Sequence, residues 1–106
     1  MIKEITVKEM KEMRDNNVEF QLIDVREPYE YEVANLNGEL IPLATIPHNI
    51  SKIEKEKTVV VHCRSGKRSA SAIDFLQKNY GFTNLLNLQG GIIAWANEID
   101  NSLDVV

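Results

Sequence analysis

The feature that most constrains this chain is an uninterrupted run of β-branched residues, Thr58-Val59-Val60-Val61. β-Branched side chains favour strands, and a run of this kind is typical of a strand buried on both faces of a sheet. A polar turn over Cys63 to Lys67 follows, and then a helix from about Arg68 to Tyr80, which Gly81 ends. A buried strand that leads directly into a helix is the unit from which parallel sheets are built.

Helices and strands alternate along the rest of the chain. Thr6 and Glu9 have the spacing of a capping box and predict the start of a helix that ends at Asp15-Asn16-Asn17. The remaining predicted elements are a strand over Phe20 to Val25, a helix from Pro28 to Val33, a strand at Leu40-Ile41 within the otherwise irregular stretch Asn35 to Pro47, a helix over Ile50 to Glu56, a strand over Leu85 to Leu88 and a helix from Ile92 to about Glu98. This alternation predicts an α/β fold with a mainly parallel central sheet of four to five strands flanked by helices.

Length and composition limit the classes of protein that fit. A chain of 106 residues suits one compact domain, so we expect a single domain over 1–106, with its core at about 3–100 and a frayed tail at 101–106. No apolar run approaches the roughly 18 residues of a membrane span, and no signal peptide is visible, so we expect a cytoplasmic protein without membrane contact. One cysteine and two histidines make neither an internal disulfide nor a convincing zinc site, so we expect no metal and no cofactor.

Charge is unevenly distributed. Acidic residues outnumber Lys and Arg by 16 to 12, which disfavours nonspecific binding to nucleic acid. Residues 57–73 nevertheless contain no acid and four bases, Lys57, Arg64, Lys67 and Arg68. A cationic island in an acidic protein indicates a local anion site, although a solvated basic turn would show the same pattern.

The only cysteine stands at the first position of the turn in this island. An ordinary thiol has a pKa of about 8.5, which a helix N-terminus and nearby cations lower to roughly 3.5–7.5. Cys63 has both, because a helix follows it and Arg64, Lys67 and Arg68 lie close in sequence. Gly66 permits backbone conformations that turn N–H groups inward. A lone cysteine is often a small buried apolar residue, but five polar, charged or glycine residues follow this one, which favours a reactive thiolate.

His62 precedes the cysteine and could act as its base. Adjacent residues on a strand point to opposite faces, which favours a structural role for His62 at the end of the strand. His48 follows a proline in an irregular stretch, and we expect it at the surface.

Three blocks of sequence carry a family resemblance. They are Leu22-Ile23-Asp24-Val25-Arg26-Glu27-Pro28-Tyr29-Glu30-Tyr31, the loop Cys63 to Arg68 with Ser69 after it, and Asn87-Leu88-Gln89-Gly90-Gly91-Ile92-Ile93-Ala94-Trp95. In order and spacing they resemble the single-domain rhodaneses, sulfurtransferases of the thiosulfate:cyanide type, over about residues 3 to 100. The resemblance implies a rhodanese-like α/β fold.

One stretch departs from the family pattern. Rhodaneses usually carry Gly-His-Ile and then Pro-Gly-Ala after the first block, whereas this chain has Ala34-Asn35-Leu36-Asn37-Gly38-Glu39-Leu40-Ile41-Pro42-Leu43. Because the histidine is absent, the resemblance does not extend to the path of the chain near the second strand. The cysteine loop is unaffected.

The length of the cysteine loop separates the reaction classes found on this fold. The loop from Cys63 to Arg68 has six residues, like that of rhodaneses. In the related cell-cycle phosphatases and arsenate reductases the loop is one residue longer and holds a tetrahedral oxyanion. Cysteine phosphatases in general place an arginine six positions after the cysteine, where this chain has Ser69. The resemblance therefore favours sulfur transfer over a small phosphatase or arsenate reductase, which is the alternative.

The resemblance also implies a mechanism and a set of site residues. The Cys63 thiolate would take the outer sulfur of a donor such as thiosulfate, release sulfite and become a persulfide, from which a thiol or cyanide accepts the sulfur. Arg64 and Lys67 would hold the sulfonate of the donor, unless they are only exposed loop charges. The predicted cradle of the persulfide consists of Arg64, Ser65, Gly66, Lys67 and Arg68; Asp24, Arg26 and Ser69 are expected to support the loop, and Trp95 to lie in the core or pocket wall.

Other functions stay open beside the small-molecule enzyme. A rhodanese-like domain can be a non-catalytic binding module, although inactive members usually lack the cysteine that this chain keeps. Cys63 can also accept sulfur from a protein persulfide and pass it to a partner protein, in which case thiosulfate is only a laboratory donor.

Overall fold

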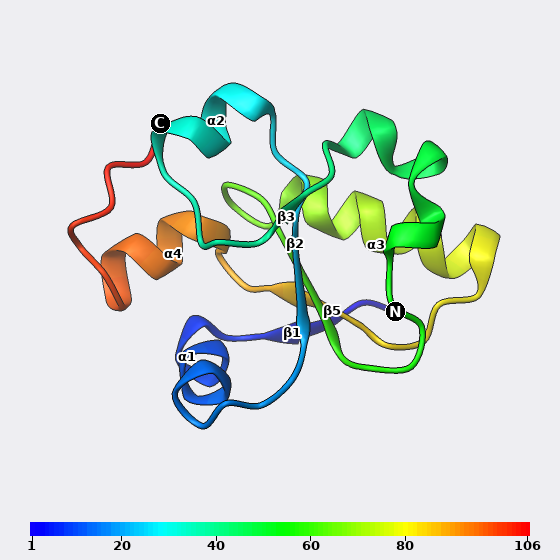
Figure 1. Cartoon of the computed structure of the whole chain (residues 1–106), viewed down its shortest axis with the longest axis horizontal. Helices are drawn as coiled ribbons and strands as arrows, with labels where there is room; N and C mark the ends of the chain where they lie inside the picture. Colours follow the sequence, from blue (N-terminus) through cyan, green and yellow to red (C-terminus); the bar gives the residue numbers. More distant parts are fainter.

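A computed structural model describes all 106 residues, and its centre is one sheet of five parallel strands in the order β1-β5-β4-β2-β3 (Figure 1). The strands are β1 (Lys3–Ile5), β2 (Gln21–Asp24), β3 (Glu39–Leu40), β4 (Val59–His62) and β5 (Leu85–Leu88). The α-helices are α1 (Val7–Asp15), α2 (Pro28–Val33), α3 (Lys67–Tyr80) and α4 (Gly91–Glu98). The predicted α/β class with a parallel central sheet is confirmed.

Strand β4 occupies the middle of the sheet, between β5 and β2, and all of its residues are buried. On one face, Val59 and Val61 pack with α3 and with two 3₁₀ segments, Leu43–His48 and Ile50–Lys52. On the other face, Val60 packs with apolar residues of α1 and α4. Because both faces are covered, the strand carries no polar alternation, as the β-branched run predicts.

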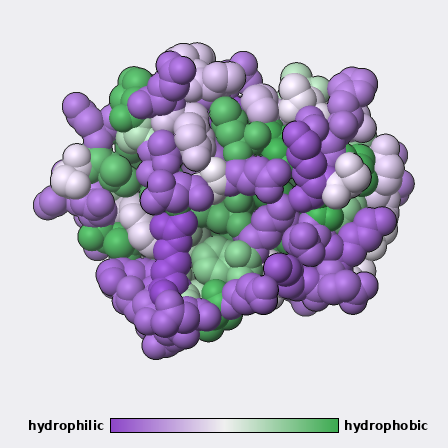
Figure 2. Space-filling model, viewed as in Figure 1, coloured by the Kyte–Doolittle hydropathy of each residue, from purple (hydrophilic) through white to green (hydrophobic).

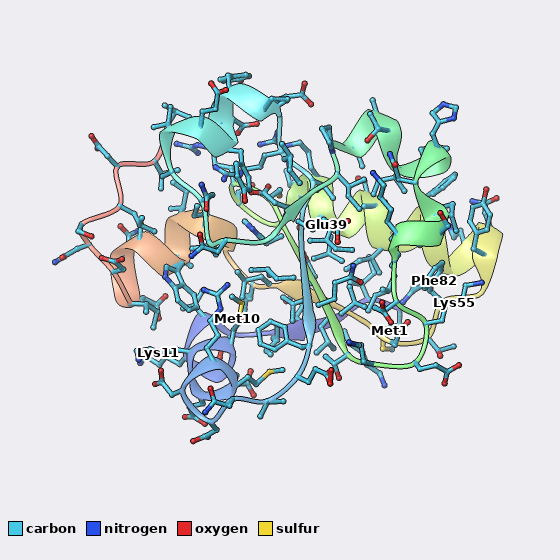
Figure 3. All side chains as sticks on the ribbon, viewed as in Figure 1. Met1, Met10, Lys11, Glu39, Lys55 and Phe82 are labelled. Atoms are coloured by element: carbon cyan, nitrogen blue, oxygen red, sulfur yellow. The ribbon has the colours of Figure 1, made fainter.

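Local signals set the helix ends. The Thr6 hydroxyl accepts a hydrogen bond from the Glu9 N–H at 3.1 Å, and the Glu9 carboxylate accepts one from the Thr6 N–H at 2.8 Å, which is the predicted capping box. Met10 then faces the sheet and is fully buried, whereas Lys11 points away from it (Figure 3). Gly81 ends α3 in a left-handed conformation, with φ at 68°.

Several local predictions were wrong. Strand β1 was not expected, because a three-residue strand is too short to show a pattern. The stretch predicted to be irregular contains the 3₁₀ segment Leu43–His48, with Pro47 inside it. The helix expected over Ile50 to Glu56 is only the short 3₁₀ segment Ile50–Lys52, and β3 begins one residue before the predicted position.

The residues after α4 form no helix or strand, and two of their side chains contact the core. Leu103 and Val105 are half-buried and pack against the apolar cluster formed with α1 and α4. The carbonyl oxygen of Val106 accepts a hydrogen bond from Arg64 Nε at 2.7 Å. The end of the chain consequently lies near α2 and the cysteine loop (Figure 1).

The surface complements this core. Hydrophilic side chains cover most of the face drawn in Figure 2, with smaller hydrophobic areas between them. The ammonium of Lys55 lies 5.7 Å from the centre of the Phe82 ring and covers part of it (Figure 3). None of the helices has the length and apolar character needed to cross a lipid bilayer.

Candidate active site

Cys63 directly follows β4, at the carboxyl edge of the parallel sheet, where ligands bind in folds of this class. Its side chain is almost fully buried beneath the loop that leads into α3. The Gly66 N–H points back at Cys63 Sγ, at 3.1 Å. This turn requires φ at 104° for Gly66, a conformation that a side chain would disfavour. The glycine therefore lets a backbone donor face the sulfur, as the sequence predicts.

Two opposing effects act on the Cys63 thiol. Burial raises its pKa, because the thiolate loses contact with water. Hydrogen bonds from the backbone N–H groups of Ser69, Gly66 and Ser65 are among the contacts that lower the pKa. These donors prevail, so the pKa of Cys63 lies below its ordinary value. The sulfur thus lies in a small enclosed site whose donors favour one negative charge.

The first turn of α4 holds the cysteine loop from the outside. The Ile92 N–H donates to the Cys63 carbonyl at 3.0 Å, and the Ile93 N–H donates to the Arg64 carbonyl at 3.2 Å. Gly91 makes this approach possible, because a Cβ at this position would lie 2.5 Å from the Cys63 carbonyl oxygen and closer still to that of Arg64. The third sequence block therefore positions the loop that the second block forms.

Ser69 and Asn87 form a buried network beside the thiol. The Ser69 hydroxyl lies 3.5 Å from Cys63 Sγ and 2.5 Å from Asn87 Oδ1. The Asn87 amide nitrogen donates to the Gly66 carbonyl at 3.1 Å and to the Glu4 carboxylate at 3.3 Å. Asn87 was not predicted as a site residue. The signal that could have found it is a buried polar residue among the leucines of β5.

Arg68 does not leave its charge free for a ligand. Its guanidinium donates two hydrogen bonds to the buried Glu30 carboxylate on α2, at 2.7 and 2.9 Å. The hydrogen bonds from Arg68 lower the pKa of Glu30 to about 2, against the opposing effect of burial. The same contact raises the pKa of Arg68. Arg68 was predicted to contribute its charge to the cradle, and the structure shows that Glu30 neutralises most of that charge.

The two other basic residues of the loop point outward. Arg64 is exposed, and its Nε is bound to the carbonyl of Val106. Lys67 is exposed at the first position of α3 and forms no ion pair. Lys67 is therefore the cation of the loop that is most available to a dissolved anion.

Asp24, Arg26 and His62 form a separate buried group under the sheet edge. Arg26 Nη2 donates to Asp24 at 2.9 Å and to the Ala34 carbonyl at 2.8 Å. Burial lowers the pKa of His62, and although the neighbouring Asp24 opposes this, the pKa stays below the ordinary value, so the ring is neutral at pH 7. His62 Nε2 lies 3.6 Å from Asp24, and its Nδ1 lies 3.3 Å from the Cys63 carbonyl. Asp24 and Arg26 thus reach the loop only through His62, and none of the three faces the sulfur.

Comparison with known protein families agrees with the geometry of the cysteine loop. The sequence model of the rhodanese-like domain family matches residues 6–98 of the chain. The chain belongs to the rhodanese-like domain family. Other rhodanese-like domains share its fold: a rhodanese-like domain protein from Staphylococcus aureus superposes with a TM-score of 0.83 and 32% identity, covering 99% of both chains. The resemblance to rhodaneses seen in the sequence is therefore confirmed.

Sulfurtransferases are among the similar proteins. A sulfurtransferase from Allochromatium vinosum is 37% identical over 97 residues, which cover 91% of this chain and 90% of that protein. A probable adenylyltransferase/sulfurtransferase, MoeZ, from Mycobacterium tuberculosis is 37% identical over 98 residues, 90% of this chain. This rhodanese-like chain spans only 25% of the length of MoeZ. The similarities place the chain in a sulfur-transfer family.

The contact between α4 and the loop predicts a specific effect of Gly91→Ala. The new Cβ would displace the Cys63 and Arg64 carbonyls, so we expect loss of most sulfur-transfer activity and a rise in the pKa of Cys63 as the loop donors move. Gly81→Ala is the matched control, because Gly81 has a similar φ of 68° but no atoms within 4 Å of an added Cβ. It should cost only about 1–2 kcal/mol of left-handed strain. Unfolding curves and alkylation rates measure both effects, and equal behaviour of the two variants would contradict the role of Gly91.

The pair between Glu30 and Arg68 predicts a pH dependence of stability. Because folding lowers the pKa of Glu30 to about 2, its contribution is complete above the unfolded pKa of about 4.3 and is lost as the pH falls towards 2. Glu30→Gln should remove about 3 kcal/mol of this acid-sensitive stability, whereas the exposed Glu32→Gln on the same helix should not. Urea unfolding between pH 7 and pH 2 tests this. Parallel pH profiles for the wild type and Glu30→Gln would contradict it.

Proposed function

We propose that this rhodanese-like domain is a sulfurtransferase that carries sulfane sulfur on Cys63 as a persulfide. The observation that carries the proposal is the enclosed sulfur site, in which backbone N–H groups of a six-residue loop converge on Cys63 Sγ. Preorganised amide donors stabilise a compact anion without reorganisation, and a terminal persulfide sulfur is such an anion. Similarity to sulfurtransferases, including a putative sulfurtransferase from Bacillus subtilis that is 36% identical over 98 residues, supports it.

The proposed reaction has two displacement steps. In the first, the Cys63 thiolate attacks the outer sulfur of thiosulfate; a bond forms between the two sulfurs, the bond to the sulfonate sulfur breaks, and sulfite leaves with the electron pair. In the second, cyanide or a thiolate attacks the terminal sulfur of the persulfide, and Cys63 leaves as the thiolate. The loop amides stabilise the negative charge on the enzyme before, between and after these steps.

The charge of the site favours sulfur over phosphate. A phosphate ester bound for hydrolysis carries two negative charges, and bidentate arginine contacts are the usual way to hold it. Here both terminal nitrogens of Arg68 donate to Glu30. The sixth position after the cysteine, where cysteine phosphatases place an arginine, is Ser69. We therefore propose sulfur transfer rather than phosphatase or arsenate reductase activity, with no hydrolysis of an aryl phosphate.

A protein partner is part of the proposal. MoeZ is named as both an adenylyltransferase and a sulfurtransferase. A relative from Bacillus subtilis that is 29% identical is named a putative sulfur carrier protein. We infer that a protein persulfide or a partner thiol is the physiological donor or acceptor, and that thiosulfate and cyanide replace them in an assay.

Intact-protein mass spectrometry tests the persulfide directly. After incubation with thiosulfate, or with a persulfide donor, the protein should gain the mass of one sulfur atom, and cyanide should remove it. Cys63→Ser should show no gain while keeping its fold. A stable gain in the serine variant, or no gain in the wild type with either donor, would overturn the proposed function.

Lys67 is proposed to bind the sulfonate of the donor. Lys67→Ala should raise KM for thiosulfate several-fold with little change in kcat, because the lost attraction acts mainly on binding. Lys78→Ala at the other end of α3 is the control, since Lys78 is paired with Asp74, far along the same helix. Steady-state kinetics at low ionic strength measure both variants. A KM that is unchanged in Lys67→Ala removes Lys67 from the donor site.

A further inference from the structure

The Ser69 hydroxyl stands between two acceptors but has only one proton to donate. Its oxygen lies 2.5 Å from Asn87 Oδ1 and 3.5 Å from Cys63 Sγ. All three side chains are buried, so water cannot take the place of either partner. The direction of this one proton decides whether Ser69 donates to the sulfur or presents a lone pair to it.

The orientation of the Asn87 amide settles the direction. Its nitrogen faces two acceptors, the Gly66 carbonyl and the Glu4 carboxylate, and donates one proton to each. A rotated amide would place its oxygen against both of these oxygens. Asn87 Oδ1 therefore faces Ser69, and because an amide oxygen only accepts, the hydroxyl proton points at Asn87.

We propose that Asn87 is a positioning residue for sulfur transfer: it holds the Ser69 proton away from Cys63, so that the backbone N–H groups alone stabilise the thiolate. The proposal rests on the proposed function. Ser69 can turn its proton to the sulfur only by leaving a buried amide oxygen without a donor, which is unfavourable. Asn87 thus competes with the thiolate for one hydrogen bond.

This competition has a consequence for reactivity. A thiolate that is stabilised more strongly is present in a larger fraction but is a weaker nucleophile, and the best attacking thiol has a pKa near the ambient pH. By withholding one donor, Asn87 limits how far the loop lowers the pKa of Cys63. The nucleophile keeps the reactivity that attack on a sulfur donor requires.

The charged and titratable groups around the sulfur take no part in the competition for the Ser69 proton. They are His62 on β4, Arg68 on α3 with Glu30 on α2, the outward Arg64 and Lys67 of the loop, Asp24 at the end of β2 with Arg26 just after the strand, and Glu4 on β1, which is hydrogen-bonded to Asn87. The first turn of α4 has no charged side chain. Of these groups, only Glu4 is hydrogen-bonded to one of the two side chains to be replaced, and it loses this bond whenever Asn87 is replaced. A double-mutant cycle, in which this loss is common to both backgrounds, therefore assigns the change in thiol pKa to the hydroxyl.

The test is a double-mutant cycle on the pKa of Cys63 with wild type, Ser69→Ala, Asn87→Leu and the double variant. The pH dependence of alkylation by iodoacetamide reports this pKa alone, because Cys63 is the only cysteine. Ser69→Ala should leave the pKa unchanged or lower. In the wild-type background, Asn87→Leu frees the Ser69 proton to turn to the thiolate and should lower the pKa of Cys63. In the Ser69→Ala background there is no hydroxyl to turn, so the pKa shift caused by Asn87→Leu should be less negative by about half a unit to one unit. Loss of the bond to Gly66 is common to both backgrounds and cancels in the comparison.

A rise in the pKa of Cys63 in Ser69→Ala would overturn the proposal, because the hydroxyl would then donate to the thiolate in the wild type. Equal shifts from Asn87→Leu in both backgrounds would reduce Asn87 to a structural role and would also overturn it. If Asn87→Leu does not fold, Ser69→Ala decides alone, since it removes only one hydroxyl. Alkylation needs no sulfur donor, so its outcome is distinct from a failure to form the persulfide.

Discussion

The chemistry of this site depends on two hydrogen bonds on the outside of the cysteine loop. The carbonyls of Cys63 and Arg64 are held by the N–H groups of Ile92 and Ile93. In a trans peptide the carbonyl and the following N–H point in opposite directions. Holding the Arg64 carbonyl outward therefore turns the next N–H group, that of Ser65, towards the inside of the loop, where it is one of the donors to the sulfur. Gly91 is required because only a residue without a side chain allows α4 to come this close.

Amide donors give the site its selectivity, because they supply positive potential without a full charge. Arg68, the cation best placed to bind an oxyanion, is bound to Glu30, and the Glu30 carboxylate is also held by the N–H of Glu27 as a helix cap. Glu30, which caps the start of α2, thus neutralises most of the positive charge of Arg68 beside the cysteine loop. The resulting site suits one negative charge on a polarisable sulfur better than two charges on a phosphate.

Much of this was predictable, and the remainder has a common physical origin. The capping box of α1, the buried β4 and the glycine that ends α3 are local signals, and each appears within one residue of its predicted place. Strand β1 and the role of Asn87 depend on contacts between residues far apart in sequence. Asn87 meets Gly66 across 21 positions and Glu4 across 83, so neither contact leaves a pattern in a local window. The pairing of Arg68 with Glu30, 38 positions away, was missed for the same reason.

Residues 63–66 of the six-residue loop have no regular structure of their own, so their conformation is imposed by the elements around them. Strand β4 places the sulfur, α3 supplies the Ser69 backbone donor, α4 orients the peptides, and Asn87 on β5 fixes the Gly66 carbonyl. Burial of the sulfur in the core raises its pKa, and the donors around the sulfur together outweigh that effect. A free peptide of the same sequence would have neither the burial nor the aligned donors. The reactivity of the cysteine is therefore a property of the packed fold, since each donor is held in place by a different helix or strand.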